Sequence, residues 1–158
     1  TRLDLSDTGL TTLERGAFEG LGGLIELDLS DTGLTTLEEG IFGGLGNLTR
    51  LYLSRNPMLA TLQRGVFEGL GGLTHLHLNV NRLTTLEQGI FEGLGKLRWL
   101  DLRTTGLITL ERGIFERLDG LTHLRLSPQH REYELKTLFV DQPMRAGATR
   151  ARLRALCM

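Results

Sequence analysis

The stretch LTHLHLNVNRLTTLEQGIFEGLGK, Leu73–Lys96, is the clearest copy of a unit that repeats along most of the chain. The leucine at its fourth position recurs every 24 residues, with one interval of 25, at Leu3, Leu27, Leu51, Leu76, Leu100 and Leu124. A phenylalanine column keeps the same register at Phe18, Phe42, Phe67, Phe91 and Phe115. Self-similarity at a fixed period is the signature of a repeat architecture. The fold of the array therefore follows from the structure of one unit.

The spacing of the leucines predicts the structure of each unit. A Leu-x-Leu alternation, as at Leu76 and Leu78, is typical of a short strand with one face buried. A single unit would leave its leucines and phenylalanine exposed, and burying them requires the next unit stacked alongside. We therefore predict an α/β-type solenoid, with short parallel strands on one face and mainly turns on the other.

Two irregular features of the unit are expected to lie in its loops. The extra residue of the long interval falls at Asn56-Pro57-Met58, just past the predicted strand, where a proline without an N–H is tolerated. A glycine column is expected to hold unusual backbone angles. Its members are Gly16, Gly40, Gly65, Gly89 and Gly113.

Composition and charge exclude several classes of function. The 158 residues carry a net charge of −1, with 40% hydrophobic and 23% charged side chains, so charge-driven binding to nucleic acid is not expected. No apolar run approaches the roughly 20 residues of a membrane-spanning helix, so we expect no membrane insertion in this segment. Cys157 is the single cysteine and cannot form an internal disulfide or a cysteine-based metal cluster.

The repeating pattern resembles the 24-residue "typical" leucine-rich repeats of Toll-like receptors, small leucine-rich proteoglycans and lamprey variable lymphocyte receptors. The resemblance covers residues 1–127 and implies a horseshoe arc whose strands line a concave face. It also implies ligand binding and an extracellular location, although the chain shows no signal peptide and no cysteine-rich caps. The family's asparagine column is Asn only at Asn56 and Asn81, with threonine at Thr8, Thr32 and Thr105. Because threonine offers one hydroxyl where asparagine offers a donor and an acceptor, we expect weaker hydrogen bonding there.

The positions that flank the central leucine of each strand should point outward on the concave face. The first two repeats share the string LDLSDTGLTTLE, whereas these outward positions diverge from the third repeat onward. The only Trp, one of two Tyr and three of four His occupy them, and aromatic and arginine side chains most often anchor interfaces. We predict a ligand-binding patch of two parallel rows and one neighbouring arginine, made of Arg50, Tyr52, His75, His77, Trp99, Asp101, Arg103, His123 and Arg125.

The sequence favours a protein ligand, bound by a receptor-like recognition module. An alternative is a scaffolding or regulatory segment of a larger intracellular protein. A third reading uses His75 and His77 with Asp101 on the next strand as metal ligands. No phosphate-binding loop or nucleophile motif is present, so we expect neither an enzyme nor a cofactor.

The repeat pattern stops after Ser127. We expect a repeat domain over 1–127 and a non-repeat cap with a basic tail over 128–158. Leu135, Leu138 and Phe139 have helical spacing and could cover the open end of the stack. The amino end has no equivalent cover, which makes self-association through uncapped ends a further expectation.

Overall fold

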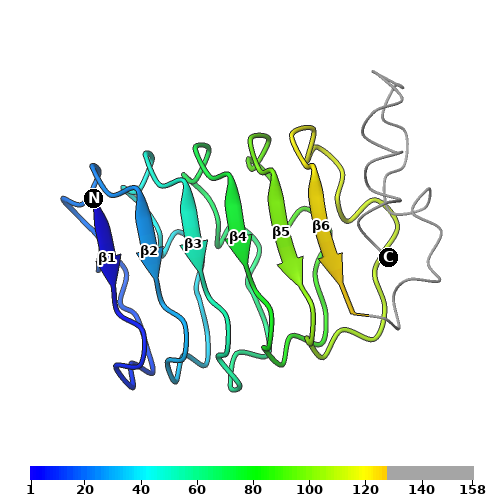
Figure 1. Cartoon of the computed structure of the whole chain (residues 1–158), viewed down its shortest axis with the longest axis horizontal. Coiled ribbons are helices and arrows are strands. Elements are labelled where there is room, and N and C mark those ends of the chain that lie inside the picture. Colours follow the sequence, from blue (N-terminus) through cyan, green and yellow to red (C-terminus); the bar gives the residue numbers. More distant parts are fainter. Residues whose placement is uncertain (128–158) are drawn as a thin grey trace.

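The protein is a stacked array of coils. A computed structural model describes residues 1–127 (Figure 1). Six short strands lie side by side in chain order and pair in parallel as one sheet. Their bounds are β1 Arg2–Asp4, β2 Glu26–Asp28, β3 Arg50–Tyr52, β4 His75–His77, β5 Trp99–Leu102 and β6 His123–Leu126. Turns and irregular segments return the chain from each strand to the next. The predicted solenoid of short parallel strands is confirmed.

The strand register follows the leucine column without a slip. Leu51 pairs with Leu76 although 25 residues separate them, just as Leu27 pairs with Leu51 over 24. The extra residue is taken up in a turn at Pro57 and Met58, and Met58 is 57% exposed. The predicted position of the irregularity beyond the strand is therefore confirmed.

The core is built from the repeating leucines and phenylalanines. The central strand leucines from Leu27 to Leu124 have no exposed surface. The five phenylalanines form a stacked column with ring centroids 6.1, 6.4, 6.2 and 5.9 Å apart along the array. Each unit thus buries its apolar side chains against the next one, as the repeat spacing requires.

One column of the repeat holds asparagine in two coils and threonine in three, and the asparagines make more hydrogen bonds to neighbouring coils than the threonines do. The Asn56 Nδ2 donates to the carbonyls of Leu29 and Leu53, one in the preceding coil and one in its own. The hydroxyls of Thr8 and Thr105 donate only within their own coil, to Leu5 and Leu102. The weaker bonding predicted for threonine is confirmed at Thr8 and Thr105, whereas the Thr32 hydroxyl reaches Asn56 Oδ1 of the next coil at 2.6 Å.

Two columns of residues adopt left-handed backbone angles. The predicted glycine column does so, with φ between 70° at Gly40 and 85° at Gly16. A second column, which the sequence did not reveal, consists of non-glycine residues directly past the strands. Its members are Asp7, Asp31, Arg55, Val80 and Thr104, with φ between 52° and 60°.

The amino end of the array lies within the described residues, whereas the cap expected beyond residue 127 does not. At the amino end the leucines of the first coil are only partly buried, and Leu21 and Ile25 are each 38% exposed. The predicted cap and tail over 128–158 lie outside the described residues. Within 1–127, no helix has the length and apolar character needed to cross a membrane.

Candidate binding face

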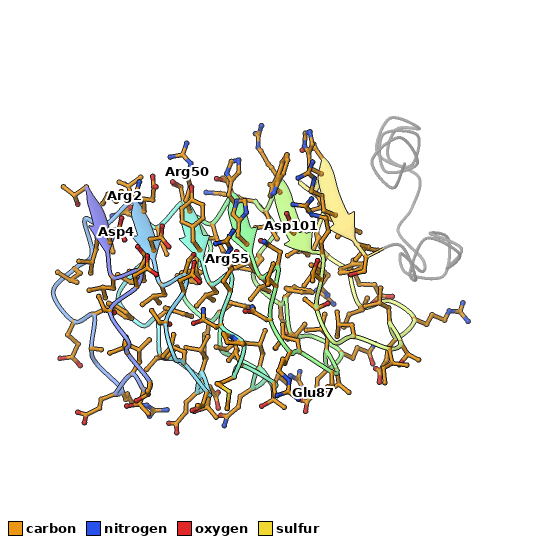
Figure 2. All side chains as sticks on the ribbon, turned by 60° about the horizontal axis from the view of Figure 1, so that its bottom comes forward. Arg2, Asp4, Arg50, Arg55, Glu87 and Asp101 are labelled. Carbon is orange, nitrogen blue, oxygen red and sulfur yellow. The ribbon has the colours of Figure 1, made fainter. Side chains whose placement is uncertain are left out.

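The side of the sheet that points away from the core, here called the open face, carries the residues that flank each central leucine. Figure 2 shows Arg2 and Arg50 on this strand side and Glu87 on the turns at the opposite side of the molecule. Four predicted contact residues, Arg50, Arg103, His123 and Arg125, are exposed. Four others are half-buried, namely Tyr52, His75, His77 and Trp99. The structure therefore brings eight of the nine predicted residues to one accessible surface.

Four rings on the open face form a continuous stack, here called the aromatic ladder. Ring centroids lie 4.9 Å apart between Tyr52 and His77, 6.2 Å between His77 and Trp99, and 4.8 Å between Trp99 and His123. The sequence predicted two separate rows, with Tyr52 and His77 in one and Trp99 and His123 in the other. The structure joins them, because the ladder changes rows between β4 and β5.

The ladder presents ring edges rather than ring faces to a ligand. Its centroid separations of 4.8 and 4.9 Å match the strand spacing of about 4.8 Å. Rings stacked along the direction that joins neighbouring strands cover one another's faces and turn their edges outward. The edge of an aromatic ring carries the positive part of its quadrupole, so these edges favour electron-rich groups.

Arg125 lies over the indole of Trp99, with its guanidinium carbon 5.1 Å from the ring centroid. Such a cation–π contact holds the guanidinium at the surface without neutralising it. The Trp99 Nε1 is buried and has no hydrogen-bond partner within the described part of the chain. A buried N–H without an acceptor carries an uncompensated desolvation cost.

Asp101 differs from its expected place among the exposed contact residues. The residue is 2% exposed. Its carboxylate is held by Arg103, whose Nε lies 3.0 and 3.2 Å from the two carboxylate oxygens and whose Nη2 lies 2.7 Å from one of them. This contact raises the pKa of Arg103 above its usual value. The two residues are neighbours on one face of the chain, so the longer side chain folds over the shorter one and neutralises it.

Two histidines on the open face are oriented by the threonine that precedes each. The Thr74 hydroxyl donates to the Thr49 carbonyl at 2.9 Å and also lies 2.8 Å from His75 Nδ1. Since a hydroxyl has one hydrogen, its oxygen must accept from His75, which places that proton on Nδ1. Thr122 and His123 repeat the arrangement, at 3.0 Å to the Arg98 carbonyl and 2.9 Å to the ring. Both neutral histidines therefore keep Nε2 as a hydrogen-bond acceptor.

The histidines of β4 are held neutral by their surroundings. Burial lowers the pKa of His75, and the charges of Arg50, His123 and Arg98 lower it further. Burial also lowers the pKa of His77, and the nearby Asp101 opposes this effect. Burial raises the pKa of Tyr52. The Tyr52 and His77 rings of the ladder are therefore kept in their neutral forms by burial.

The metal reading of His75, His77 and Asp101 is wrong for this structure. Both oxygens of Asp101 are occupied by Arg103, as described above. Across residues 1–127, no group of three or more His, Cys, Asp or Glu side chains is arranged to hold a metal ion.

The repeat family is shown by comparison with known sequences. The family model for the leucine rich repeat matches residues 1–58 and 58–107, more than half of the chain. The chain belongs to the leucine-rich repeat family. No curated protein matches its sequence significantly.

Solved leucine-rich repeat structures of the Toll and Toll-like receptor group share this fold. The TLR13–ssRNA13 complex is 33% identical with a TM-score of 0.76, over 82% of this chain and 19% of that one. The glycosylated Drosophila Toll–Spatzle complex is 32% identical with a TM-score of 0.74, over 79% and 16%. A second Toll–Spatzle structure, at 24% identity and a TM-score of 0.73, covers 88% and 19% and supports the fold. The chain spans under a fifth of the length of these receptors.

Acidic residues at the amino end of the leucine-rich repeat sheet are already paired within the chain. Arg2 lies 2.9 Å from Asp4, 3.3 Å from Glu26 and 3.3 Å from Asp28. Arg50 and Arg55 add ion pairs to Glu26 at 3.6 Å and to Asp31 at 3.5 Å. We did not predict this network, although Arg2, Glu26 and Arg50 alternate in sign along one outward column of the sequence.

Arg98 is a residue of the open face that sequence reasoning missed. It is exposed and close enough to His75 to lower the pKa of that histidine. It stands one position before β5, outside the two columns next to the central leucine. The column before each strand would have revealed it, since the equivalent residues are Ile25, Thr49, Thr74 and Thr122.

A hollow lies among the turns on the side of the leucine-rich repeats away from the sheet. It has a volume of about 590 Å³ and is lined by glycines, by core residues such as Phe67 and Ile90, and by Arg64 and Glu92. The core residues are almost fully buried, and the Arg64–Glu92 ion pair, at 3.6 Å, is largely exposed. Accordingly, the open face offers the better candidate site.

Proposed function

We propose that this chain is a protein-binding leucine-rich repeat module that holds its ligand against the open face. The observation that carries the proposal is the aromatic ladder with Arg125. The phenylalanines of the array are buried in the core, whereas Tyr52, Trp99 and two histidines are gathered on the accessible side of the sheet. Large rings that are partly exposed and already fixed by stacking lose little entropy on binding and are frequent interface anchors.

The contact patch of this proposal consists of the predicted residues other than Asp101, with Arg98 added. Asp101 supports it by positioning Arg103. Toll in its complex with Spatzle provides a related example of a protein with a bound partner. We further propose that the module binds its ligand without catalysing a reaction, as leucine-rich repeat proteins of this kind typically do.

A single-stranded nucleic acid is the second candidate ligand, favoured by the 33% identity to TLR13, whose structure is a complex with ssRNA13. The ladder argues against it, because bases are bound by stacking on free ring faces. Here the faces of neighbouring rings cover one another.

The test is loss of binding on removal of the ladder. Immobilised wild-type protein and a Tyr52→Ala/Trp99→Ala variant are used to capture partners, and each captured protein is purified and titrated against both. Trp99→Ala alone is expected to leave the fold intact by circular dichroism and to weaken binding by about 2 kcal/mol or more. Met58→Ala, at an exposed apolar residue on a loop, is the matched control and is expected to have no effect. Equal affinity of wild type and Trp99→Ala for every captured protein would contradict the proposal.

A further inference from the structure

Within residues 1–127, the open face carries an excess of acidic residues on its β1–β2 half and unpaired cations on its β4–β6 half. On β1 and β2 the strand acids Asp4, Glu26 and Asp28 are ion-paired with arginines of the same face. On β4–β6 the balance is reversed. Arg103 is neutralised by Asp101, but Arg98 and Arg125 have no ion pair within residues 1–127. Both are exposed, so two cations are available to a ligand on the half that also carries most of the ladder.

The same half gains a hydrogen-bond donor when His75 takes up a proton. His75 and His123 are fixed with the proton on Nδ1, so Nε2 accepts a hydrogen bond in the neutral state. Protonation of His75 converts its Nε2 from an acceptor to a donor and adds a positive charge. A ligand that offers acceptors with negative charge would therefore meet Arg98, Arg125 and the His75 Nε2–H group on one surface.

We propose that the β4–β6 half of the open face binds an acidic protein segment through its carboxylates, and that protonation of His75 strengthens this binding. This inference rests on the proposed function and names the chemistry of its partner. One carboxylate contacts Arg125, which is held over the indole of Trp99. A second carboxylate is bound by Arg98 and by His75.

The charged neighbours of His75 are consistent with this assignment. His75 faces Arg50 from β3, Arg98 from the segment before β5, and His123 from β6, and all three charges disfavour its protonation in the free protein. His123 lies on Trp99 beside Arg125, two residues along its own strand. A bound carboxylate supplies the negative charge that these surroundings lack, so binding and proton uptake must favour each other.

Two other occupants fit less well. A second copy of this chain would have to offer its acidic β1–β2 half, whose carboxylates are already paired within the chain. An RNA strand would find phosphate contacts, but the ladder offers it ring edges instead of stacking faces. An acidic segment needs only cations and outward N–H and C–H groups, which this half provides.

The experiment uses three rhodamine-labelled probes at constant ionic strength: a ten-residue glutamate peptide, a ten-residue glutamine peptide and a ten-nucleotide uridine RNA. Fluorescence anisotropy measures their affinity for the whole chain at pH 6.0 and 7.5. The glutamate peptide is expected to bind, and to bind more tightly at pH 6.0 than at pH 7.5, since a rise of about one unit in the pKa of His75 on binding contributes at most a factor of about ten. The glutamine peptide is expected not to bind.

Variants identify the residues responsible. Arg125→Gln is expected to weaken binding of the glutamate peptide about tenfold at both pH values, while Arg125→Lys retains most of it. His75→Gln is expected to reduce the pH dependence and to leave the affinity at pH 7.5 nearly unchanged. Arg112→Gln, at an exposed arginine on the turns away from the sheet, is the matched control and should bind as wild type does.

The inference is overturned if the glutamate and glutamine peptides bind equally, if the RNA binds more tightly than the glutamate peptide, or if Arg112→Gln weakens binding as much as Arg125→Gln. A wild-type dimer in sedimentation that Arg125→Gln dissociates would also overturn it, in favour of self-association. If the glutamate peptide fails while a captured protein still depends on Trp99, the inference falls and the proposed function stands.

Discussion

At the scale of single residues, the column directly past the strands places side chains in a backbone conformation that favours glycine and asparagine. Val80 has a φ of 60° and Thr104 a φ of 54°. For a β-branched side chain this left-handed conformation is a genuine outlier, with a cost of about 1–2 kcal/mol. The aspartates of the first two coils meet the same requirement at a lower cost, because a short polar side chain can bond locally.

Replacing Val80 should therefore stabilise the protein. Val80→Asn is expected to raise the free energy of unfolding by about 1 kcal/mol, since asparagine tolerates the left-handed region and the valine side chain is 41% exposed. Urea denaturation measures the change. Thr104→Asn should act in the same direction. Thr109→Asn, at an exposed threonine without a positive φ, should change stability by less than about 0.5 kcal/mol. A destabilised Val80→Asn protein would contradict the strain at this column.

The sequence predicted which face of the sheet carries the contact residues, but it did not predict the conformations of their side chains. The period of 24 placed Tyr52, His77, Trp99 and His123 on one face, because strand residues alternate between the two sides of a sheet. Which rings stack depends on side-chain rotamers, so the crossing of the ladder between rows could not be foreseen. The burial of Asp101 likewise depends on the reach of Arg103, which the alternation of strand residues does not describe.

At the scale of the repeating element, the asparagine column joins one coil to the next. Asn56 has no exposed surface and makes contacts in two directions. Its Oδ1 accepts from the Thr32 amide at 3.1 Å and from the Thr32 hydroxyl at 2.6 Å, while Nδ2 donates to carbonyls. Asn81 takes the next position and accepts from the Asn56 amide at 2.8 Å. A buried backbone at the end of each strand is thereby kept hydrogen-bonded.

Removing one member of this column should be costly. Asn56→Ala is expected to lower the free energy of unfolding by about 2–4 kcal/mol, because it leaves the buried Thr32 amide without its partner and removes the Nδ2 bonds to the Leu29 and Leu53 carbonyls. Guanidinium denaturation measures the loss. Asn79→Ala is the matched control, since Asn79 is half-buried and accepts from the Ser54 hydroxyl at 2.7 Å. It should cost less than half as much, and equal losses would refute the role assigned to the column.

The elements were predicted from the sequence almost completely. Leu-x-Leu spacing located every strand, and the departures from asparagine located the weaker hydrogen bonds at Thr8 and Thr105. The left-handed column at Val80 was not foreseen, because aspartate, arginine, valine and threonine share no preference that would mark the position. Here the conformation is imposed by the stacking of the coils and overrides local propensity.

At the scale of the whole molecule, each coil contacts only its neighbours, so the effect of a core substitution should depend on its place in the array. Phe67 stacks on Phe42 and Phe91, whereas Phe18 at the amino end stacks on Phe42. Phe67→Ala is expected to cost about 3–5 kcal/mol, because the cavity lies between two packed neighbours.

Phe18→Ala is the matched variant at the amino end and should cost clearly less than Phe67→Ala. Thermal unfolding followed by calorimetry compares the two, and the Phe67→Ala transition should also broaden as the halves of the array become less coupled. Equal losses with equally sharp transitions would show that the array unfolds as one indivisible unit.

The turn at Pro57 and Met58 has a consequence for how such a chain can change length. An additional amino acid there leaves the strands on either side paired as if nothing had been inserted, so growth at this loop is mechanically separated from the sheet. The turn of a coil can then be lengthened by mutation while the open face keeps its geometry. The same loop is a natural place to introduce a fluorescent label or an epitope without disturbing the ligand-facing side.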